Sequence, residues 1–349
     1  MVNYFLPSES GIIFLKDLPE KEVFLWIEET YRENFVNFLS SYFPSWNEIA
    51  RKLKLKINPK NNSCEFLRQL RRKRYINLGL IKEIIALLNQ EGVKRFSLDE
   101  LQNFLRGIRV TNGKPILNPK FPINFNSISG AILLSGVYHD GGISVRDLAP
   151  FYCNTVAKLK KRFVHSFHFL IGDYEFSKKR FWKEVVCPKI FGIYLVILGF
   201  VPGKKSINNF VPPPFLFSTS EEFKRTFLSQ AIADDGYVYN PKNKIGFITI
   251  NQTVDLSHFS DKMRSLIKKK KFPEEMPKTL LLDLYLFKSL GIKTAGPYLK
   301  AEKIYPHRYC QEWCFNIREL QSIKFLADTL KIPLNYKQKA LENLAMRSR

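Results

Sequence analysis

Two stretches of this sequence place an acid and a glycine directly after an apolar run. They are LLSGVYHDGGIS, residues 133–144, and FLSQAIADDGYV, residues 227–238. Asp140–Gly141 in the first stretch corresponds to Asp235–Gly236 in the second, 95 residues later. An internal repeat of this kind predicts two copies of one structural unit. The fold therefore has to accommodate two apolar helices that each end in a carboxylate.

The helix expected before Asp235 has an apolar stripe and a start signal. Its stripe has helical spacing and consists of Phe223, Phe227, Leu228, Ala231 and Ile232. Ser218 and Glu221 have the spacing of a capping box at the first turn. A carboxylate at the far end meets the negative end of the helix dipole, which disfavours it by about 0.3–1 kcal/mol. A bound cation would reverse that sign. The simpler alternative is an Asp-Gly turn with the glycine in the left-handed position after the helix.

The similarity between the two stretches continues downstream. Asn154 follows Asp140 by 14 residues, and Asn251 follows Asp235 by 16 residues. Each copy then reaches an apolar helix and a lysine-bearing loop, in LVILGFVPGKKS and FLADTLKIPLNYKQK respectively. These matches predict a duplicated αββα-type unit.

The charge balance indicates a polyanionic partner. The 349 residues include 55 Lys and Arg against 32 Asp and Glu, which gives a net charge of +23. Such an excess is typical of proteins that bind nucleic acid, with an acidic membrane surface as the weaker alternative. The longest apolar run, residues 190–201, is shorter than the ~20 residues that span a bilayer and predicts a buried helix.

The N-terminus and the cysteines bear on the compartment. The first residues lack the pattern of a secretion signal. Five scattered cysteines fit reduced thiols better than a disulfide framework, so we expect a cytoplasmic protein. Cys310 and Cys314 have no second pair at metal spacing, so a zinc site is not expected.

Residues 1–121 predict a separate, helical DNA-binding domain. A first helix within residues 44–56 and a second within residues 64–90 have the pattern of a helix-turn-helix. The cations expected to contact DNA from the second helix are Arg68, Arg71, Arg72, Lys73 and Arg74. An ordinary helical hairpin with a solvated basic face is the alternative. The proline-containing linker at 109–126 predicts a boundary near residue 122.

A further DNA contact is expected from a hairpin. GYVYNPKNKIGFITI, residues 236–250, alternates apolar and polar residues around an Asn-Pro-Lys-Asn turn. Lys242 and Lys244 lie in that turn, where they are candidates to bind phosphate.

The two acidic stretches resemble the paired signature motifs of the LAGLIDADG homing endonucleases. The resemblance covers roughly residues 122–345, and LGFVPGKKSINNFVPPPFLF and IKFLADTLKIPLNYKQKALENL resemble the segments that close the two repeats in archaeal members. It implies an α+β fold of two αββαββα repeats, residues 122–217 and 218–349, related by a pseudo-twofold axis. In that family the motif helices pack at the axis, and a four-stranded antiparallel sheet on either side saddles the DNA major groove.

The resemblance also implies a metal site. In the family the terminal acids bind a divalent cation, so Asp140 and Asp235 are expected to hold Mg²⁺, or another divalent cation such as Mn²⁺. Phosphodiester hydrolysis needs an activated water, neutralised phosphoryl charge and help for the leaving oxygen, all of which such a cation provides.

Four further residues are assigned by their position in the repeats. Lys205 and Lys337 are expected to organise water or stabilise the reacting phosphate, with Lys204 as a substitute for Lys205. Asn154 and Asn251 are candidates to orient water, although an asparagine at a strand end more often forms a turn.

This chain departs from the family pattern at the expected contact between the helices. Ser135 and Gln230 stand where the family prefers glycine or alanine, and the small residues Gly136 and Ala231 are the expected compensation. The first stretch also admits a second register, in which Gly136 replaces the family glycine and Gly141 the acid.

The leading prediction is a monomeric, metal-dependent endonuclease that cuts double-stranded DNA at a long, asymmetric site. Two motifs in one chain remove the need for a dimer. The alternative is a DNA-binding regulator or an RNA-splicing maturase that keeps the fold without cleavage.

Overall fold

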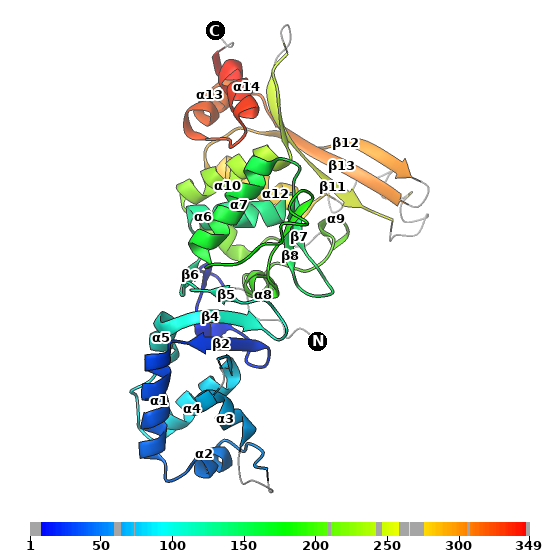
Figure 1. Ribbon diagram of the computed structural model, residues 1–349. Coiled ribbons are helices and arrows are strands. Elements are labelled where there is room, and N and C mark those ends of the chain that lie inside the picture. The colour runs from blue at the N-terminus through cyan, green and yellow to red at the C-terminus, as the bar shows by residue number, and fades with distance from the viewer. Residues whose placement is uncertain are drawn as a thin grey trace.

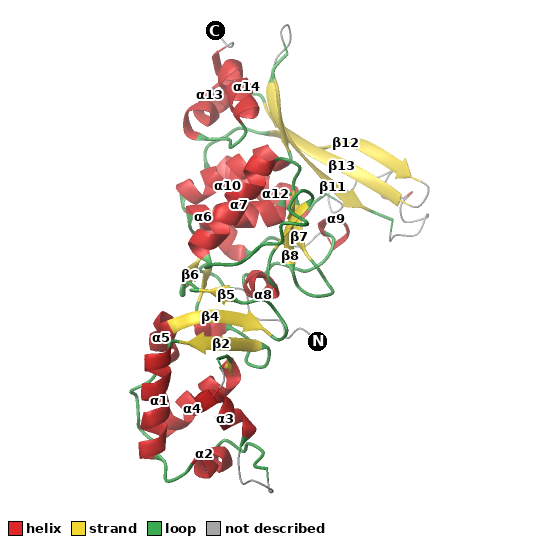
Figure 2. Ribbon diagram, in the orientation of Figure 1, coloured by secondary structure: helices red, strands yellow, loops and turns green. Residues whose placement is uncertain are grey.

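The structure is a computed structural model that describes residues 8–58, 64–72, 74–208, 211–241, 246–257, 265, 276–305 and 308–346. It is a mixed α+β protein in which several small antiparallel sheets lie among helices (Figures 1 and 2). The molecule is elongated, with the N-terminal region at one end (Figure 1). Buried apolar side chains form one connected cluster that runs from the N-terminal region to the last helix. As far as the chain is described, no helix is long and apolar enough to cross a membrane.

The N-terminal region combines helices with a sheet. Its helices are α1 (Glu29–Tyr42), α2 (Trp46–Lys52), α3 (Glu65–Arg72), α4 (Leu78–Gln90) and α5 (Leu98–Leu101). Its antiparallel sheet has the order β3–β2–β4–β5 and comprises β2 (Val23–Ile27), β3 (Ile76–Asn77), β4 (Leu105–Val110) and β5 (Ile116–Leu117). The region has the predicted helices, and in addition a four-stranded sheet that was not predicted. VFLWI and LRGIRV bury mainly alternate side chains, which favours short strands over helical turns.

The predicted recognition helix is divided into two. Helix α3 ends at Arg72, and strand β3 intervenes before α4. The side chain of Asn77 caps α4 by accepting from the Leu80 N–H at 3.2 Å. Ile49 and Ala50 of α2 are buried as expected for a first helix packed on a second. The helix-turn-helix itself stays a prediction.

The start of the described chain packs on the central region. Strand β1 (Ile12–Ile13) pairs with β6 (Ile123–Asn124). A strand from before the predicted boundary at 121/122 therefore pairs with a strand that follows it. Leu117 of β5 also forms a β-bridge with Asp173. These contacts attach the N-terminal region to the central region through main-chain hydrogen bonds.

The central region, residues 122–217, begins with the first acidic motif. Its helices are α6 (Ile128–Tyr138), α7 (Ala157–Leu170), α8 (Lys189–Ile197) and α9 (Lys205–Asn208). Its strands β7 (Gly141–Ile143), β8 (Pro150–Cys153) and β9 (Glu184–Val186) form a three-stranded antiparallel sheet. Helix α8 confirms the buried helix predicted from the apolar run at 190–201.

The C-terminal region, residues 218–349, carries the second motif and the largest strands. Its helices are α10 (Glu221–Asp234), α12 (Lys278–Ser289), α13 (Leu320–Thr329) and α14 (Asn335–Met346). Its sheet has the order β10–β11–β13–β12 and comprises β10 (Gly236–Tyr239), β11 (Phe247–Asp255), β12 (Ala295–Tyr305) and β13 (Arg308–Ile317). Helix α10 starts one residue after Ser220, whose side chain accepts from the Phe223 N–H, so the predicted cap at Ser218 is wrong.

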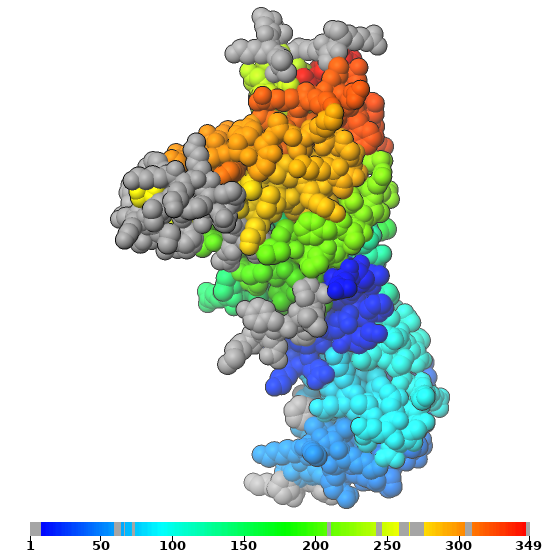
Figure 3. All heavy atoms as spheres, turned by 180° about the vertical axis from the view of Figure 1, so that it is seen from behind, coloured from blue at the N-terminus to red at the C-terminus, as the bar shows by residue number. Residues whose placement is uncertain are grey.

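The two sheets that flank the central helices are unequal. The resemblance implied four strands on each side, but the described sheet β7–β8–β9 of the 122–217 region has three strands of three or four residues. Between α7 and β9 the sequence carries the cation run SKKR, which does not alternate apolar and polar residues. In contrast, β12 and β13 have eleven and ten residues, and in the view from behind they extend as an arm from the body (Figure 3).

Candidate functional site

Helices α6 and α10 lie side by side in the middle of the molecule (Figure 1). The fully buried Ser135 of α6 donates its hydroxyl to the Phe227 carbonyl of α10 at 2.9 Å. Ser135 thus occupies the helix contact expected of a small residue, and this favours the register in which Asp140 is the acid. Gly136 does not supply that contact, because a Cβ there would meet the Phe163 ring of α7 at 3.0 Å.

The two motif acids follow the helix ends and share an electrostatic environment. An amide holds each of them, since Asn154 Nδ2 donates to Asp140 Oδ2 at 2.6 Å and Gln252 Nε2 donates to Asp235 Oδ2 at 2.6 Å. Burial and then the nearby charge of Asp235 raise the pKa of Asp140 to about 6. The structure therefore brings the two predicted acids together at one centre.

The two predicted asparagines have different surroundings. Asn154 forms a turn, because its Oδ1 accepts from the Val156 N–H at 2.8 Å, and its amide also reaches Asp140. Asn251 does not contact Asp235 in the described contacts; its neighbour Gln252 does. Successive strand residues point to opposite faces, so in β11 residue 252 faces the same side as the buried Ile250. Whether either asparagine orients water stays a prediction.

A third acid, Asp234, belongs to the same centre. Its Oδ1 accepts from Tyr152 OH at 2.6 Å, and its two oxygens accept from Gln230 Nε2 at 3.1 Å each. Asn154 also donates to it at 3.2 Å. Burial and the charge of Asp140 raise the pKa of Asp234 to about 7. The sequence could have identified this residue, because Asp234 directly precedes the motif acid Asp235.

Gln230, whose bulk seemed unsuited to a helix contact, has a polar role. Besides Asp234, its amide contacts Tyr152 OH at 3.1 Å, and its Oε1 accepts from Arg162 of α7 at 2.9 Å. It therefore links α10 to β8 and α7 through hydrogen bonds, and this explains how a long side chain is accommodated beside α6.

Both predicted lysines bind the ends of the motif helices. Lys205 Nζ donates to the carbonyls of Val137 at 3.3 Å, Tyr138 at 2.6 Å and His139. Lys337 Nζ donates to the carbonyls of Ile232 at 2.7 Å, Ala233 at 2.8 Å and Gly236 at 2.7 Å. An ammonium has three N–H donors, so each is fully used by main-chain carbonyls.

These lysines bring positive charge to the acids without touching them. Withdrawal from water lowers the pKa of Lys205 to about 8 and lowers that of Lys337, while the carboxylates of the centre oppose both shifts. A cation at a helix C-terminus also offsets the helix dipole. Their role toward water or phosphate stays a prediction. Lys204 is exposed and lines the neighbouring cleft.

The glycine after each acid is required by space. Neither Gly141 nor Gly236 has a positive φ, so the left-handed turn considered from the sequence is not what these glycines provide. A Cβ on Gly236 would lie 2.6 Å from Ile232 Cα, and one on Gly141 would collide with the Phe151 carbonyl. The strand thus leaves each helix in contact with its last turn.

Gly236→Ala is expected to lower the free energy of unfolding by about 1–3 kcal/mol, because the added methyl group meets main-chain atoms that have no room to move. Urea unfolding followed by circular dichroism measures the loss. Gly142→Ala is the matched control, since its Cβ would meet only the Phe151 ring, at 3.0 Å. Equal losses in the two variants would contradict the requirement for a glycine at 236.

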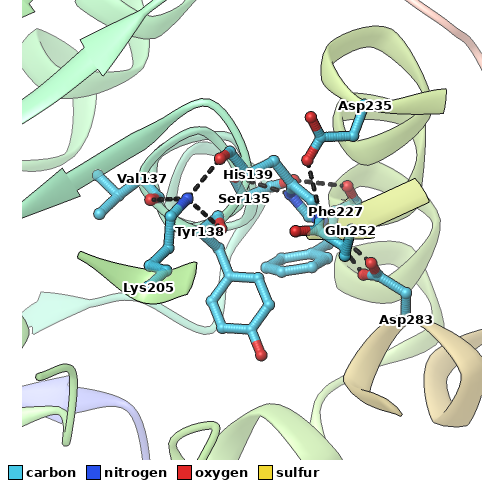
Figure 4. A network of polar contacts seen from close by, with 9 residues as sticks. All are labelled: Ser135, Val137, Tyr138, His139, Lys205, Phe227, Asp235, Gln252 and Asp283. Carbon is cyan, nitrogen blue, oxygen red and sulfur yellow. Dashed lines mark hydrogen bonds and ion pairs between the residues drawn. The ribbon is translucent and has the colours of Figure 1, made fainter. Parts of the chain in front are cut away.

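A buried ion pair underlies the centre (Figure 4). His139 Nε2 lies 3.2 Å from both carboxylate oxygens of Asp283 on α12, and both side chains are fully buried. Burial alone would lower the pKa of His139, but the charge and hydrogen bond of Asp283, together with the charges of Asp235 and Asp234, raise that pKa to about 9. The protonated ring donates from Nδ1 to the Ser135 carbonyl at 2.9 Å. No local sequence pattern pointed to this pair.

A cleft opens beside Asp235. Its volume is about 600 Å³, and its lining includes Ser144, Lys204, Asp235, Gln252 and Thr279. It is open to solvent, has both polar and apolar lining residues, and is bounded by one acid of the centre. Its dimensions allow a phosphate group to approach Asp235 from outside.

The donor chemistry of the centre fits a hard divalent cation. Mg²⁺ is typically held by one or two carboxylates, with water and substrate phosphate as its other ligands. Asp140 and Asp235 provide two carboxylates at the negative ends of two helices. Over the part of the chain that is described, no group of three or more His, Cys, Asp and Glu side chains could hold a metal ion. The residues therefore fit a cation that is completed by substrate, not one enclosed by protein.

The predicted DNA-binding cations are only partly visible. Arg68 is exposed and pairs with Glu65, and the guanidinium of Arg71 lies 5.0 Å from the centroid of the Trp46 ring. Arg74 lies over the Trp26 ring at 3.4 Å. Lys73, Lys242, Lys244 and the side chain of Arg72 lie outside the described residues.

Comparison with known proteins gives distant similarity to solved structures. No protein-family model and no curated protein sequence matches this chain. Among solved structures, the chain is similar to the N-terminal LAGLIDADG domain of DUF199/WhiA, with 13% sequence identity and a TM-score of 0.31. The match covers 66% of this chain and 98% of that domain. Similarity at this level does not by itself establish a shared fold.

Proposed function

We propose that this protein is a sequence-specific DNA endonuclease of the LAGLIDADG type, with two repeated halves and a divalent cation at Asp140 and Asp235. One observation carries the proposal. Lys205 binds the carbonyls of residues 137 and 138, and Lys337 binds those of residues 232 and 233. Residue 232 follows residue 137 by 95 positions, and residue 233 follows residue 138 by the same interval. The two acids are also 95 residues apart.

The matching lysine–carbonyl contacts support duplication, because the repeated sequence pattern does not specify which carbonyls each lysine binds. The lysines lie on different elements, α9 and α14, yet each caps the motif helix of its own half. An amide from a following strand or turn also holds each acid. Two equivalent helix ends, each with one carboxylate, one amide and one lysine bound to the helix carbonyls, suit a substrate with two antiparallel strands.

The residues of the chain have separate roles in this proposal. Asp140 and Asp235 hold the cation, which when bound neutralises phosphate charge and activates water. Asn154 and Gln252 fix the rotamers of the acids by donating to one oxygen of each. Lys205 and Lys337 hold the helix ends in place and offset the negative charge gathered there. The net charge of +23 attracts the DNA backbone.

A second candidate is a DNA-binding regulator on the same architecture that does not cleave. It is favoured by the full use of both lysine ammonium groups by carbonyls, which leaves neither directed at a phosphate. The small sheet of the 122–217 region also offers less surface for the second half of a symmetric target. The two candidates share DNA binding and differ only in chemistry.

Incubation with supercoiled plasmid libraries that carry random inserts separates the two candidates. With Mg²⁺, an endonuclease produces linear products whose ends map to one sequence, and EDTA abolishes them. A regulator enriches one bound sequence in a selection experiment but leaves it intact. Failure to enrich or cut any DNA sequence would overturn both candidates.

Replacing Arg68 and Arg71 together with alanine is expected to reduce the slope of log affinity against log salt by about two, at roughly 0.9 per phosphate contact. Fluorescence anisotropy with a labelled duplex at 50–200 mM salt measures the slope. Lys324→Ala, which removes an exposed cation of α13 outside the N-terminal region, is the surface-charge control, and its slope is expected to stay close to that of the wild type. An unchanged slope in the double variant would mean that the basic face of α3 is only solvated.

A further inference from the structure

The loop before β9 differs from its surroundings in composition and exposure. Residues 177–183, SKKRFWK, are here called the Trp182 loop. Every residue of this loop is exposed except Phe181, which is partly buried against the core. The loop stands where the family resemblance implied further strands of a DNA-contacting sheet. Residues 177–183 thus form a loop and add no strand to the sheet β7–β8–β9.

Trp182 is displayed to solvent. Its exposed fraction is 77%, whereas Trp313 is 6% exposed and Trp26 and Trp46 are partly buried. Burying a side chain as large as tryptophan stabilises a fold through the hydrophobic effect. The exposed Trp182 does not contribute this stabilisation. Isolated exposed apolar residues are common in proteins, so exposure by itself assigns no role.

A buried lysine fixes the loop in the conformation that exposes Trp182. Lys160 of α7 is 2% exposed, and its Nζ donates to the Trp182 carbonyl at 2.8 Å. The same ammonium lies 5.4 Å from the centroid of the Phe181 ring. Burying a lysine is costly unless it is hydrogen-bonded. The hydrogen bond from Lys160 therefore ties the main chain of the loop to α7. Phe181 is thereby held inward and the next residue, Trp182, outward.

The rest of the loop is strongly basic. Its exposed cations are Lys178, Lys179, Arg180 and Lys183. Arg180 pairs with Glu184 at 3.4 Å and is itself 67% exposed. A basic segment attracts the phosphate backbone, and an exposed aromatic ring within it provides a face on which a base can stack. The combination matches the chemistry of a nucleic acid better than that of an apolar protein surface.

The Trp182 loop leads directly to the acidic centre. Glu184 pairs with Cys153 in the β8–β9 ladder, and Cys153 immediately precedes Asn154, which binds Asp140. Because the chain advances at most about 3.8 Å per residue and paired residues are about 5.5 Å apart, the Cα of Trp182 is within about 17 Å of that of Asn154. That distance corresponds to at most about five steps along one DNA strand.

We propose that Trp182 inserts at one base step of duplex DNA beside the acidic centre and stacks on the base face that the step exposes, and that the cations of its loop bind the adjacent phosphates. This inference rests on the proposed DNA binding and not on cleavage. In this proposal Trp182 makes the DNA contact of the 122–217 half, and the longer sheet β10–β13 makes the DNA contact of the other half. The halves of the protein therefore hold the two halves of the target differently.

The test compares variants of the full chain on a labelled 40-base-pair duplex of mixed sequence. Trp182→Ala is expected to weaken affinity by up to about 150-fold, because the stacking of one base is worth about 1–3 kcal/mol and the unstacking of the duplex step offsets part of it. The salt slope is expected to be unchanged. Trp182→Phe is expected to retain most of the affinity because it keeps an aromatic face. The double variant Lys178→Ala and Lys179→Ala is expected to reduce the salt slope by roughly two. Phe169→Ala, which removes an exposed aromatic side chain of α7, is the matched control.

Tryptophan fluorescence gives the second readout. DNA is expected to quench the wild-type emission and to protect it from acrylamide, and both effects are expected to be lost in Trp182→Ala. If the duplex binds but neither affinity nor quenching depends on Trp182, the inference is wrong and the proposed DNA binding stands. If no duplex binds to the wild-type protein, both fail. Quenching by single-stranded RNA alone would also overturn the inference.

Discussion

Asp235→Asn is expected to abolish Mg²⁺-dependent DNA cleavage, with a loss of at least about 10²-fold in the single-turnover rate. The carboxylate lies at the end of α10, is held by Gln252, and borders the open cleft (Figure 4). An asparagine keeps the size of the side chain but removes the charge that a divalent cation requires. DNA affinity is expected to stay within about tenfold, because phosphate contacts elsewhere hold the duplex. Cleavage and anisotropy measured on one target give both values.

The matched control for this prediction is Asp328→Asn. Asp328 is an exposed acid of α13 in the same half of the chain, so it controls for the loss of one negative charge. Its cleavage rate is expected to equal that of the wild type. Cutting at the wild-type rate by Asp235→Asn would remove Asp235 from the metal site, and would leave the DNA-binding regulator as the function that the geometry supports.

Asp283→Asn is expected to lower the free energy of unfolding by about 3–5 kcal/mol, because it leaves the buried His139 without its counter-charge. Asp283 is on α12 and His139 ends α6, so the pair also connects the two regions of the chain beneath the acids. The His139 carbonyl accepts from Lys205, and the next residue is Asp140. The loss is measured by urea unfolding with a core fluorescence signal and circular dichroism in parallel.

Two further variants make the stability prediction specific. Asp328→Asn is again the control, with an expected change within about 0.5 kcal/mol for an exposed surface position. Replacing both His139 and Asp283 with apolar residues of similar volume is expected to destabilise less than Asp283→Asn alone, since no uncompensated charge remains. If Asp283→Asn unfolded at the same urea concentration as the control, the pair would contribute nothing to the fold.

The acids show how far local pattern predicts a site. The apolar stripe before Asp235 identified α10, and the repeated Asp-Gly placed both acids at helix ends. The same pattern misjudged the glycines, because it cannot show that a strand leaves the helix close to its last turn. It pointed to Asn251, whereas the contact to Asp235 comes from the next residue, Gln252, since a shift of one residue along a strand changes the face of the sheet. The role of Asn251 toward water stays a prediction.

The sequence by itself determined the features that depend on neighbours along the chain. These are the two acidic helix ends, the buried helix at 190–201, and a charge suited to a polyanion. Tertiary structure decided which groups meet across the chain. Asp283 is 144 residues from His139, and Lys337 is 105 residues from the Ile232 carbonyl that it binds. Periodicity records only which face of an element is buried, whereas these contacts depend on how packed elements are placed relative to one another.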